Sequence, residues 1–598
     1  MASDNQLTEI DSPASPEPLP SDCKRRILLH CLAAAILSVT VFAVYSNTLH
    51  SPFLFDDRTN ILENPAVRIT SLTFENFFTA GFKSPAMNRP VANISLALNY
   101  YFHGYDVFGY HLVNILIHIL AAICIYFLAQ NILEIQIKSG NEQETHSFLI
   151  PLLAALIWAV HPIHTQSVTY IVQRMNSLAA LFYILSVLLY SKARVTDSKT
   201  FGTLFFCGSV LAGFLALGSK EIAASLPLFL FLYEWFFFKN LNRRWIKRQL
   251  PAIIFILLCS AIPALLFLGG QPVDNILSTY AQRDFTITNR LLTEPRVILY
   301  YLNLLILPLP SRLSLIHDLP VSSSLLTPPP TLFAILTLTG IAAAAIYKAK
   351  THRIFAFCLL WFLGNLLIES SVLGLEIIFE HRTYLPSMLL GLLPALLILK
   401  FPRHKPLAIS MLLILAIVFS IWTYQRNFVW KDAVTFWKDC VVKAPSSLRA
   451  HNNLGLVLAD EGNFSEAEKH FSEALKIAPG YVDARLSLGV VLKRQGRYSD
   501  AAAQYRNLLI NDPYNARAHN NLGIILKIQG NLDQAVYHYK EALRISPAYA
   551  FAHHNLANAL KIQGNLQEAA YHHARAARLD PELARARGSL LKTETGRE

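Results

Sequence analysis

The chain has 598 residues, of which 53% are apolar and only 15% charged, and its mean hydropathy is +0.36. A soluble globular chain carries about 25% charged residues, so this composition excludes a disordered chain and an all-soluble enzyme, and it indicates a membrane protein with a soluble part attached. The formal charge is +12, and most of the surplus lies in short loops between apolar runs, which is a topology signal rather than a nucleic-acid-binding patch.

Apolar runs of membrane-spanning length dominate residues 23–423, after a tail at 1–22 that is rich in Pro, Ser and Asp and is expected to be disordered. A basic cluster beginning at Lys24 precedes an apolar run from Ile27 to Tyr45, which favours an uncleaved first helix over a signal peptide. Ten further spans are predicted, giving eleven in all: 111–130, 148–163, 176–190, 201–218, 222–238, 250–268, 331–347, 354–370, 384–399 and 407–423. The stretch 296–309 is apolar but short, so a re-entrant, an interfacial and a spanning arrangement all stay open.

The distribution of Lys and Arg predicts the topology. These residues gather in every second connection, at 131–147, 191–200, 239–248, 348–353 and 400–405, on the same side as Lys24. By the positive-inside rule this side is cytoplasmic. The N-terminus is then cytoplasmic, and the loop 46–110 and everything after residue 423 face outward. The compact loops favour a bacterial inner membrane with periplasmic repeats over a lumenal placement in the endoplasmic reticulum.

Residues 424–598 repeat with a period of 34. Proline, glycine and alanine recur in register, the prolines at Pro445, Pro479, Pro513, Pro547 and Pro581. Small residues let two helices approach closely, glycine makes the turn, and proline ends the second helix. The pattern resembles the tetratricopeptide repeat, with full repeats at 448–481, 482–515, 516–549 and 550–583, a half-repeat before them and a capping helix at 582–592. The expected fold class is therefore all-α, a multi-span helix bundle followed by an α-solenoid.

The repeats also present a candidate peptide-binding ladder. Asn453, Asn521 and Asn555 share one repeat position. Asparagine amides on a concave face can hold an extended acceptor polypeptide through paired hydrogen bonds. The alternative is that these side chains only satisfy local helix contacts.

Polar residues at the outer boundary of the spans are candidates for chemistry, because such residues are costly there. Asp56 and Asp57 can act as a general base or bind a divalent cation, Mg²⁺ or Mn²⁺, or they can simply cap a loop. Lys220 in a tight outer turn can hold a phosphate, and Arg382 can bind one bidentately, with snorkelling as its alternative. The other candidates are Arg89, His161, His164, Arg174, Glu380 and His381.

An ordered set of motifs resembles a known family. The acidic pair, then RPVANISLALNYYFHGYDVFGYHLVNILIH, HPIHTQSVTYIVQR, SKEIAASLP, FEHRTYLPSM and the 34-residue repeats are similar to the transmembrane and tetratricopeptide-repeat O-mannosyltransferase-like proteins, which belong with the C-type membrane glycosyltransferases. In this sequence His381 stands between Glu380 and Arg382, where related sequences often have Glu and Arg adjacent.

The resemblance implies an integral-membrane, inverting glycosyltransferase. It would move a sugar, often mannose, from a polyprenyl-phosphate donor to an acceptor hydroxyl on the outer face. The acceptor is either a Ser or Thr of a protein, which is favoured, or another glycan. Asp56 or Asp57 would deprotonate or position the acceptor, and Arg382, with Lys220 and His381, would stabilise the leaving phosphate.

Two other classes compete with this interpretation. A non-enzymatic membrane scaffold would use the repeats for docking and would scatter the outer charged residues. A transporter would often show inverted repeats and broken helices, and no internal repeat is apparent in residues 27–423. If the protein is an enzyme, Asp56, Lys220 and Arg382 are instead expected to converge in one cavity that opens sideways to lipid.

Overall fold

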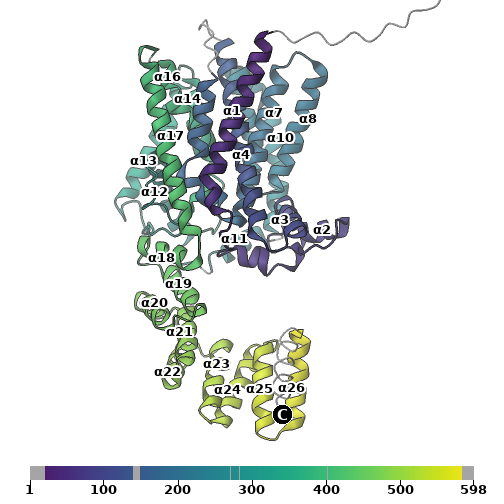
Figure 1. The fold of residues 1–598 in the computed structure, drawn as a ribbon, viewed down its shortest axis with the longest axis vertical. Coiled ribbons are helices and arrows are strands. Elements are labelled where there is room, and N and C mark those ends of the chain that lie inside the picture. Colours follow the sequence, from purple (N-terminus) through teal and green to yellow (C-terminus); the bar gives the residue numbers. More distant parts are fainter. Residues whose placement is uncertain (1–20, 139–147, 270, 282, 401, 582–598) are drawn as a thin grey trace, which may run out of the picture. The chain divides into compact units, whose positions relative to one another are not determined.

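The computed structural model describes residues 21–138, 148–269, 271–281, 283–400 and 402–581, and within them the chain is helical without strands (Figure 1). The all-α fold class predicted from the sequence is confirmed. Contacts divide the chain into two units: Met1–Pro310 with Ser322–Asn427, and Ser311–Val321 with Phe428–Glu598. Most of the tail predicted at 1–22, and the capping helix predicted at 582–592, lie outside the described residues.

The first unit is a bundle in which α1, α4, α7, α8 and α17 run alongside one another (Figure 1). Its helices are α1 Ser21–Tyr45, α2 Phe74–Phe82, α3 Pro90–His103, α4 Val107–Lys138, α5 Leu149–Ala159, α6 Thr165–Val168, α7 Arg174–Val195, α8 Lys199–Leu217, α9 Leu226–Tyr233, α10 Arg243–Leu268, α11 Pro272–Ser278, α12 Ile287–Ile306, α13 Pro330–Lys348, α14 Arg353–Leu366, α15 Leu392–Ala395, α16 Leu397–Lys400 and α17 Lys405–Asn427.

Seven helical segments in the described residues are long and apolar enough to cross a membrane, so the first unit is an integral membrane domain. They are Lys24–Thr48, Val107–Ile137, Ile171–Val195, Lys199–Leu217, Glu221–Phe238, Pro330–Lys348 and Lys405–Trp430. An eighth span results if α5 and the segment Pro162–Val168, which meet at a bend of 50°, are counted as one. Proline at position 162 explains the bend, because it has no N–H for the helical ladder.

Among the described residues, eight of the eleven predicted spans are therefore found at full length, if the bent pair is counted as one. The stretch 354–370 forms the 14-residue α14, which is shorter than a full span. The stretch 384–399 breaks into short helical turns, because Pro386 and Pro394 interrupt it. The stretch 250–268 is helical within α10. The stretch 296–309 falls largely in α12, which also carries charged residues and Pro295 inside the helix.

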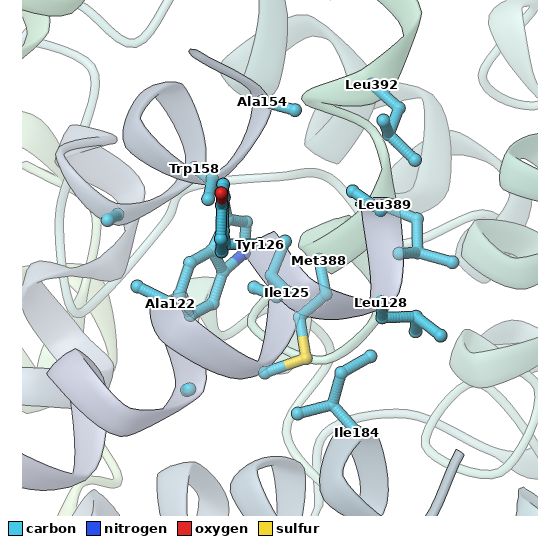
Figure 2. Packing of buried hydrophobic residues seen from close by; sticks show 14 of the residues in the cluster. Ala122, Ile125, Tyr126, Leu128, Ala154, Trp158, Ile184, Met388, Leu389 and Leu392 are labelled. Atoms are coloured by element: carbon cyan, nitrogen blue, oxygen red, sulfur yellow. The ribbon is translucent and has the colours of Figure 1, made fainter. Parts of the chain in front are cut away.

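The core of the first unit lies where α4, α5, α7 and the 386–395 segment meet (Figure 2). Because lipid is as apolar as leucine, close packing rather than water exclusion holds helices together in a membrane, and small residues permit it. Ala122 and Ala154 supply such positions beside Ile125 and Leu389. A Cβ on Gly391 would lie 2.3 Å from the Ala154 carbonyl oxygen, so only glycine fits this crossing.

The second unit is the predicted repeat solenoid. Its helices are α18 Ala433–Lys443, α19 Leu448–Asp460, α20 Phe464–Ile477, α21 Val482–Arg494, α22 Tyr498–Asn511, α23 Ala516–Ile528, α24 Leu532–Ile545, α25 Ala550–Ile562 and α26 Leu566–Leu579. The first helix of every repeat begins at the predicted residue. Gly489 packs against Tyr505 so closely that a Cβ would lie 2.5 Å from the ring, which explains the small residue at this repeat position.

Three repeats carry a head-on histidine pair between their two helices. The Nδ1 atoms of His451 and His470, His519 and His538, and His553 and His572 lie 3.1, 2.9 and 2.8 Å apart. In each pair the first-helix histidine donates from Nε2 to the carbonyl of a repeat proline. The second repeat places Arg485 and Gln504 in the same arrangement.

The segment 311–321 belongs to the second unit although it lies between α12 and α13 in the sequence. Lys443 of α18 donates from Nζ to the Leu313 carbonyl at 2.7 Å. Leu313, Leu315 and Ile316 are buried. The segment is thus an integral part of the repeat unit's packing.

Candidate active site

The two aspartates after α1 have different environments. Asp57 is buried, and its two carboxylate oxygens accept hydrogen bonds from the backbone N–H groups of Leu54 and Val172, at 2.9 and 2.7 Å. Burial raises the pKa of the Asp57 carboxyl to about 8, although the two N–H groups oppose the shift. Asp56 is exposed, so it carries the accessible carboxylate of the pair.

The turn that holds Asp56 is strained and tied to the segment before α7. Phe55 has a φ of 49°, in the left-handed region that non-glycine residues rarely adopt. The Asp56 backbone N–H donates to the Tyr170 hydroxyl at 2.8 Å. The acidic loop is therefore anchored at Tyr170 and Val172, just before the first turn of α7.

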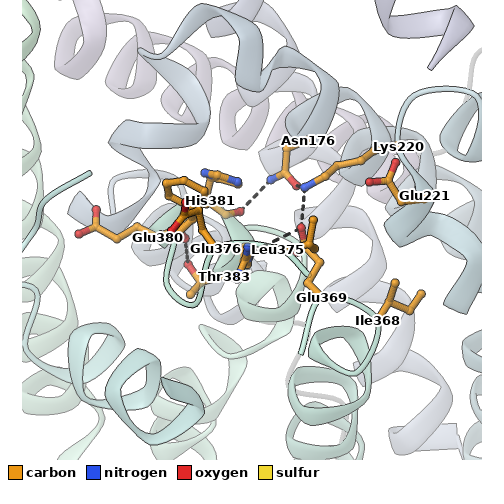
Figure 3. Close-up of polar contacts among 12 residues, drawn as sticks. Asn176, Lys220, Glu221, Ile368, Glu369, Leu375, Glu376, Glu380, His381 and Thr383 are labelled. Carbon is orange, nitrogen blue, oxygen red and sulfur yellow. Dashed lines mark hydrogen bonds and ion pairs between the residues drawn. The ribbon is translucent and has the colours of Figure 1, made fainter. Parts of the chain in front are cut away.

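Four buried polar side chains meet beside that first turn of α7, in a group that we call the cation cluster: Asn176, Lys220, Glu369 and Arg382. Figure 3 shows Asn176, Lys220 and Glu369. Lys220 Nζ donates to Glu369 Oε1 at 2.7 Å and to Asn176 Oδ1 at 3.0 Å. Asn176 also donates to the His381 carbonyl at 2.8 Å, which fixes the position of the neighbouring Arg382.

Arg382 has a buried donor that the described part of the protein does not use. It is 5% exposed, and its Nε has no hydrogen-bond partner among the described residues. The nearest carboxylate oxygen, Glu369 Oε1, is 3.9 Å away. A buried N–H without a partner is costly, so this donor is suited to an anionic ligand.

The structure brings Lys220 and Arg382 together at Glu369, and convergence of Asp56 with them stays a prediction. The Asp57 carboxylate accepts a hydrogen bond from the backbone N–H of Val172, which lies four residues before Asn176. Asp56 is anchored at Tyr170 in the same segment. The acidic loop and the cation cluster thus share the beginning of α7 as their support.

His381 supports the cluster rather than adding a charge to it. Its backbone N–H and its ring Nδ1 both lie 3.2 Å from Gln166 Oε1. Because an amide oxygen only accepts, Nδ1 carries the ring proton. Burial, with Lys220 and Arg382 nearby, lowers the pKa of His381 well below its usual value. The imidazole is therefore neutral, and its Nε2 has no proton to offer a phosphate.

Arg89 and Arg174 both make extensive contacts within the protein. Arg89 forms a two-bond ion pair with Glu221, at 2.6 and 3.0 Å. Arg174 is fully buried and donates to Asn114 at 2.7 Å, to the Tyr110 carbonyl at 2.8 Å and to Asn99. These bonds join α3, α4 and α7, so Arg174 has a structural role.

The two histidines of the bent span behave differently. His161 lies 2.9 Å from the Leu305 carbonyl through Nε2 and accepts from the Ile163 N–H through Nδ1. His164 is buried beside the rings of His118, Trp158 and Tyr384, and neither of its ring nitrogens has a hydrogen-bond partner among the described residues. Glu380 is buried and points away from Lys220 in Figure 3.

The predicted asparagine ladder is partly engaged in contacts within the solenoid. Asn555 donates to Asn520 of the preceding repeat at 2.8 Å, and Asn521 accepts from Asn520 at 3.4 Å. Asn453 is half-buried. Acceptor binding by these residues stays a prediction. Binding of a divalent cation by Asp56 and Asp57 also stays a prediction. Within the described ranges, no group of three or more metal-ligating side chains is found.

Comparisons with known proteins support the resemblance. A tetratricopeptide-repeat family model matches residues 446–509, and a second matches 486–550. A protein O-mannosyl-transferase of Caenorhabditis elegans is 26% identical, covering 72% of this chain and 61% of its own. Protein O-mannosyl-transferase TMTC3 of Homo sapiens is 25% identical, covering 73% and 50%. The chain is similar to the tetratricopeptide-repeat O-mannosyl-transferases. It spans about half to three fifths of the length of these curated relatives.

Shorter and weaker likenesses were also found. Protein O-mannosyl-transferase TMTC2 of Homo sapiens is 31% identical over 232 residues, which cover 37% of this chain and 26% of that protein. Among solved structures, a crystal structure of MamA is 18% identical and covers 27% of this chain and 93% of its own, with a TM-score of 0.24.

Three site residues escaped the sequence reasoning. Glu369, Asn176 and Gln166 were not predicted, although each touches a predicted residue. The signal for Glu369 was available, because an ionisable residue inside an apolar run is costly and therefore a candidate for function. No comparable signal marks the two amides, whose importance appears only through their contacts.

Proposed function

We propose that this protein is a membrane-embedded, inverting glycosyltransferase that moves a sugar, mannose by analogy with the names of its relatives, from a polyprenyl-phosphate donor to a Ser or Thr hydroxyl of a polypeptide. The single observation that carries the proposal is the buried Arg382 beside Lys220, because its Nε has no hydrogen-bond partner in the part of the chain that the structure describes. A desolvated pair of cations is a site for a phosphate group.

The reaction assigns separate tasks to the two groups of residues. The Asp56 carboxylate takes the proton of the acceptor hydroxyl as its oxygen attacks the anomeric carbon. The bond from that carbon to the phosphate oxygen breaks, and the polyprenyl phosphate leaves with the electron pair. Arg382 and Lys220 stabilise the charge that develops on the leaving phosphate. A single displacement inverts the anomeric configuration.

The repeats would bind the acceptor polypeptide. A solenoid of helix pairs presents an extended concave surface for a peptide, and Asn453, Asn521 and Asn555 are the candidate contacts. By the positive-inside rule the repeats and the acidic loop face the outer side of the membrane, where the donor's sugar would also have to lie.

Sugar transfer in isolated membranes tests the proposal. Radiolabelled polyprenyl-phosphate mannose is supplied to membranes containing the full chain, and label in protein is measured at equal expression. Asp56→Asn removes the base and should lower the rate about 10²–10⁴-fold. Arg382→Ala removes a transition-state donor and should lower it about 10²–10³-fold.

Arg194→Ala is the matched control, because Arg194 forms a comparable ion pair with Glu234 near the opposite end of α7. It should transfer at the wild-type rate. If wild type transfers no sugar from any polyprenyl-phosphate donor, the glycosyltransferase proposal is wrong. The scaffold alternative then gains support if the full chain still captures a polypeptide partner through its repeats.

A further inference from the structure

One carboxylate stands between the two cations of the cation cluster. Glu369 Oε1 lies 2.7 Å from Lys220 Nζ and 3.9 Å from Arg382 Nε, and all three side chains are more than nine-tenths buried. Its backbone carbonyl also accepts from Arg290 at 2.6 Å. Glu369 is therefore held in place by its main chain while its side chain faces the two candidate phosphate ligands.

Neighbouring arginines pair with carboxylates of their own, and Glu380, also buried nearby, points away from Lys220. Arg89 pairs with Glu221, Arg290 with Glu294 and Arg283 with Glu376. His381 contributes no charge, since its imidazole is neutral. Lys220 and Arg382 thus face the single carboxylate of Glu369, and the cluster carries one net positive charge.

We propose that Glu369 sets the selectivity of this site between a phosphodiester and a phosphomonoester, so that the sugar donor is held and the lipid-phosphate product is released. This inference rests on the proposed function. A polyprenyl-phosphate sugar is a phosphodiester with one negative charge. The polyprenyl phosphate that leaves is a monoester, and such groups carry about −1.5 to −2 at neutral pH. One positive charge at the site balances the single negative charge of the donor. The product has more negative charge than the site can balance.

The electrostatics give the direction of the change when Glu369 is neutralised. Coulomb energy scales with the product of the charges, so an added positive charge strengthens monoester binding about twice as much in free energy as diester binding. Glu369→Gln should therefore bind both lipids more tightly and should shift the ratio of their affinities toward the monoester by about tenfold. Donor KM falls, product inhibition grows, and kcat falls because release of the product becomes slow.

Binding to the full chain in phosphatidylcholine nanodiscs tests this. The probes are a polyprenyl phosphate and a polyprenyl-phosphate mannose of the same chain length, and steady-state kinetics supplies KM, kcat and product inhibition. Glu369→Asp keeps the charge and should keep the affinity ratio. Glu234→Gln is the matched control: Glu234 is a buried carboxylate paired with Arg194 in the same unit, and its loss should change neither affinity.

The outcomes separate this inference from the proposed function. Wild type that binds neither lipid refutes the proposed function. Wild type that binds both, with an unchanged ratio in Glu369→Gln, refutes the selectivity role alone. A purely structural role for Glu369 would weaken both lipids together and raise KM, which also contradicts the inference. Thermal unfolding of each variant shows that the comparison is made on folded protein.

Discussion

Replacing Asp57 by alanine should loosen the acidic loop without removing the Asp56 carboxylate, the proposed base. The substitution leaves the N–H groups of Leu54 and Val172 without their acceptors in a buried site. Each such orphan costs about 1–3 kcal/mol, so the total is about 2–6 kcal/mol. Asp57→Asn should cost less, because its amide oxygen still accepts one of the two bonds. Asp56→Asn should leave stability unchanged, since Asp56 is exposed.

Thermal unfolding of the purified chain in detergent, with hydrogen exchange over residues 50–64 and 170–176, measures these differences. We expect faster exchange in both segments for Asp57→Ala, together with reduced sugar transfer, because the loop no longer holds Asp56 against Tyr170. Asp56→Asn should lose transfer with unchanged exchange. Equal stability and exchange for wild type and Asp57→Ala would refute the assignment of Asp57 as the structural member of the pair.

Three further predictions follow from the packing and the charges. Arg174→Lys keeps the charge but loses the forked donors that join three helices, so the unfolding free energy should fall by at least about 2 kcal/mol, measured by thermal unfolding in detergent. Gly391→Ala should cost about 1–3 kcal/mol in the same assay, because its Cβ would meet the Ala154 carbonyl. Burial beside its partner histidine lowers the pKa of His538 to about 4, below the usual 6.5 of an unfolded chain. The unfolded state therefore binds the proton first, and stability is lost as pH falls from 6.5 toward 4. Hydrogen exchange, corrected for intrinsic rates, should rise in the three repeats with histidine pairs and not in the repeat with Arg485; equal change in all four would contradict this.

The repeat half was predictable almost to the residue, and the membrane half was not. A fixed period of 34 with glycine and proline in register specifies both helices and turns, which is why the first helix of the third repeat begins at Ala516 as expected. Apolar composition alone does not distinguish a lipid-facing helix from a buried core segment. The stretch 384–399 shows this, since Leu389 and Leu392 are fully buried in broken turns.

The candidate site was predictable in its charged members and not in its arrangement. Lys220 and Arg382 stood out because charges at a membrane boundary are costly. Their common partner Glu369 lies 149 residues from Lys220 in the chain, so only the fold reveals the pairing. His381 was expected to help bind phosphate, and its hydrogen bond to Gln166 gives it a supporting role instead.

The segment 311–321 means that the chain passes between the two units three times rather than once. A truncation designed at residue 428, to study the membrane unit alone, would keep this segment and strip away the helices that bury Leu313 and Leu315. The remaining protein would expose an apolar segment to water, and such a surface promotes aggregation. A clean separation of the two units calls for an excision in the middle of the gene as well as a stop codon near its end.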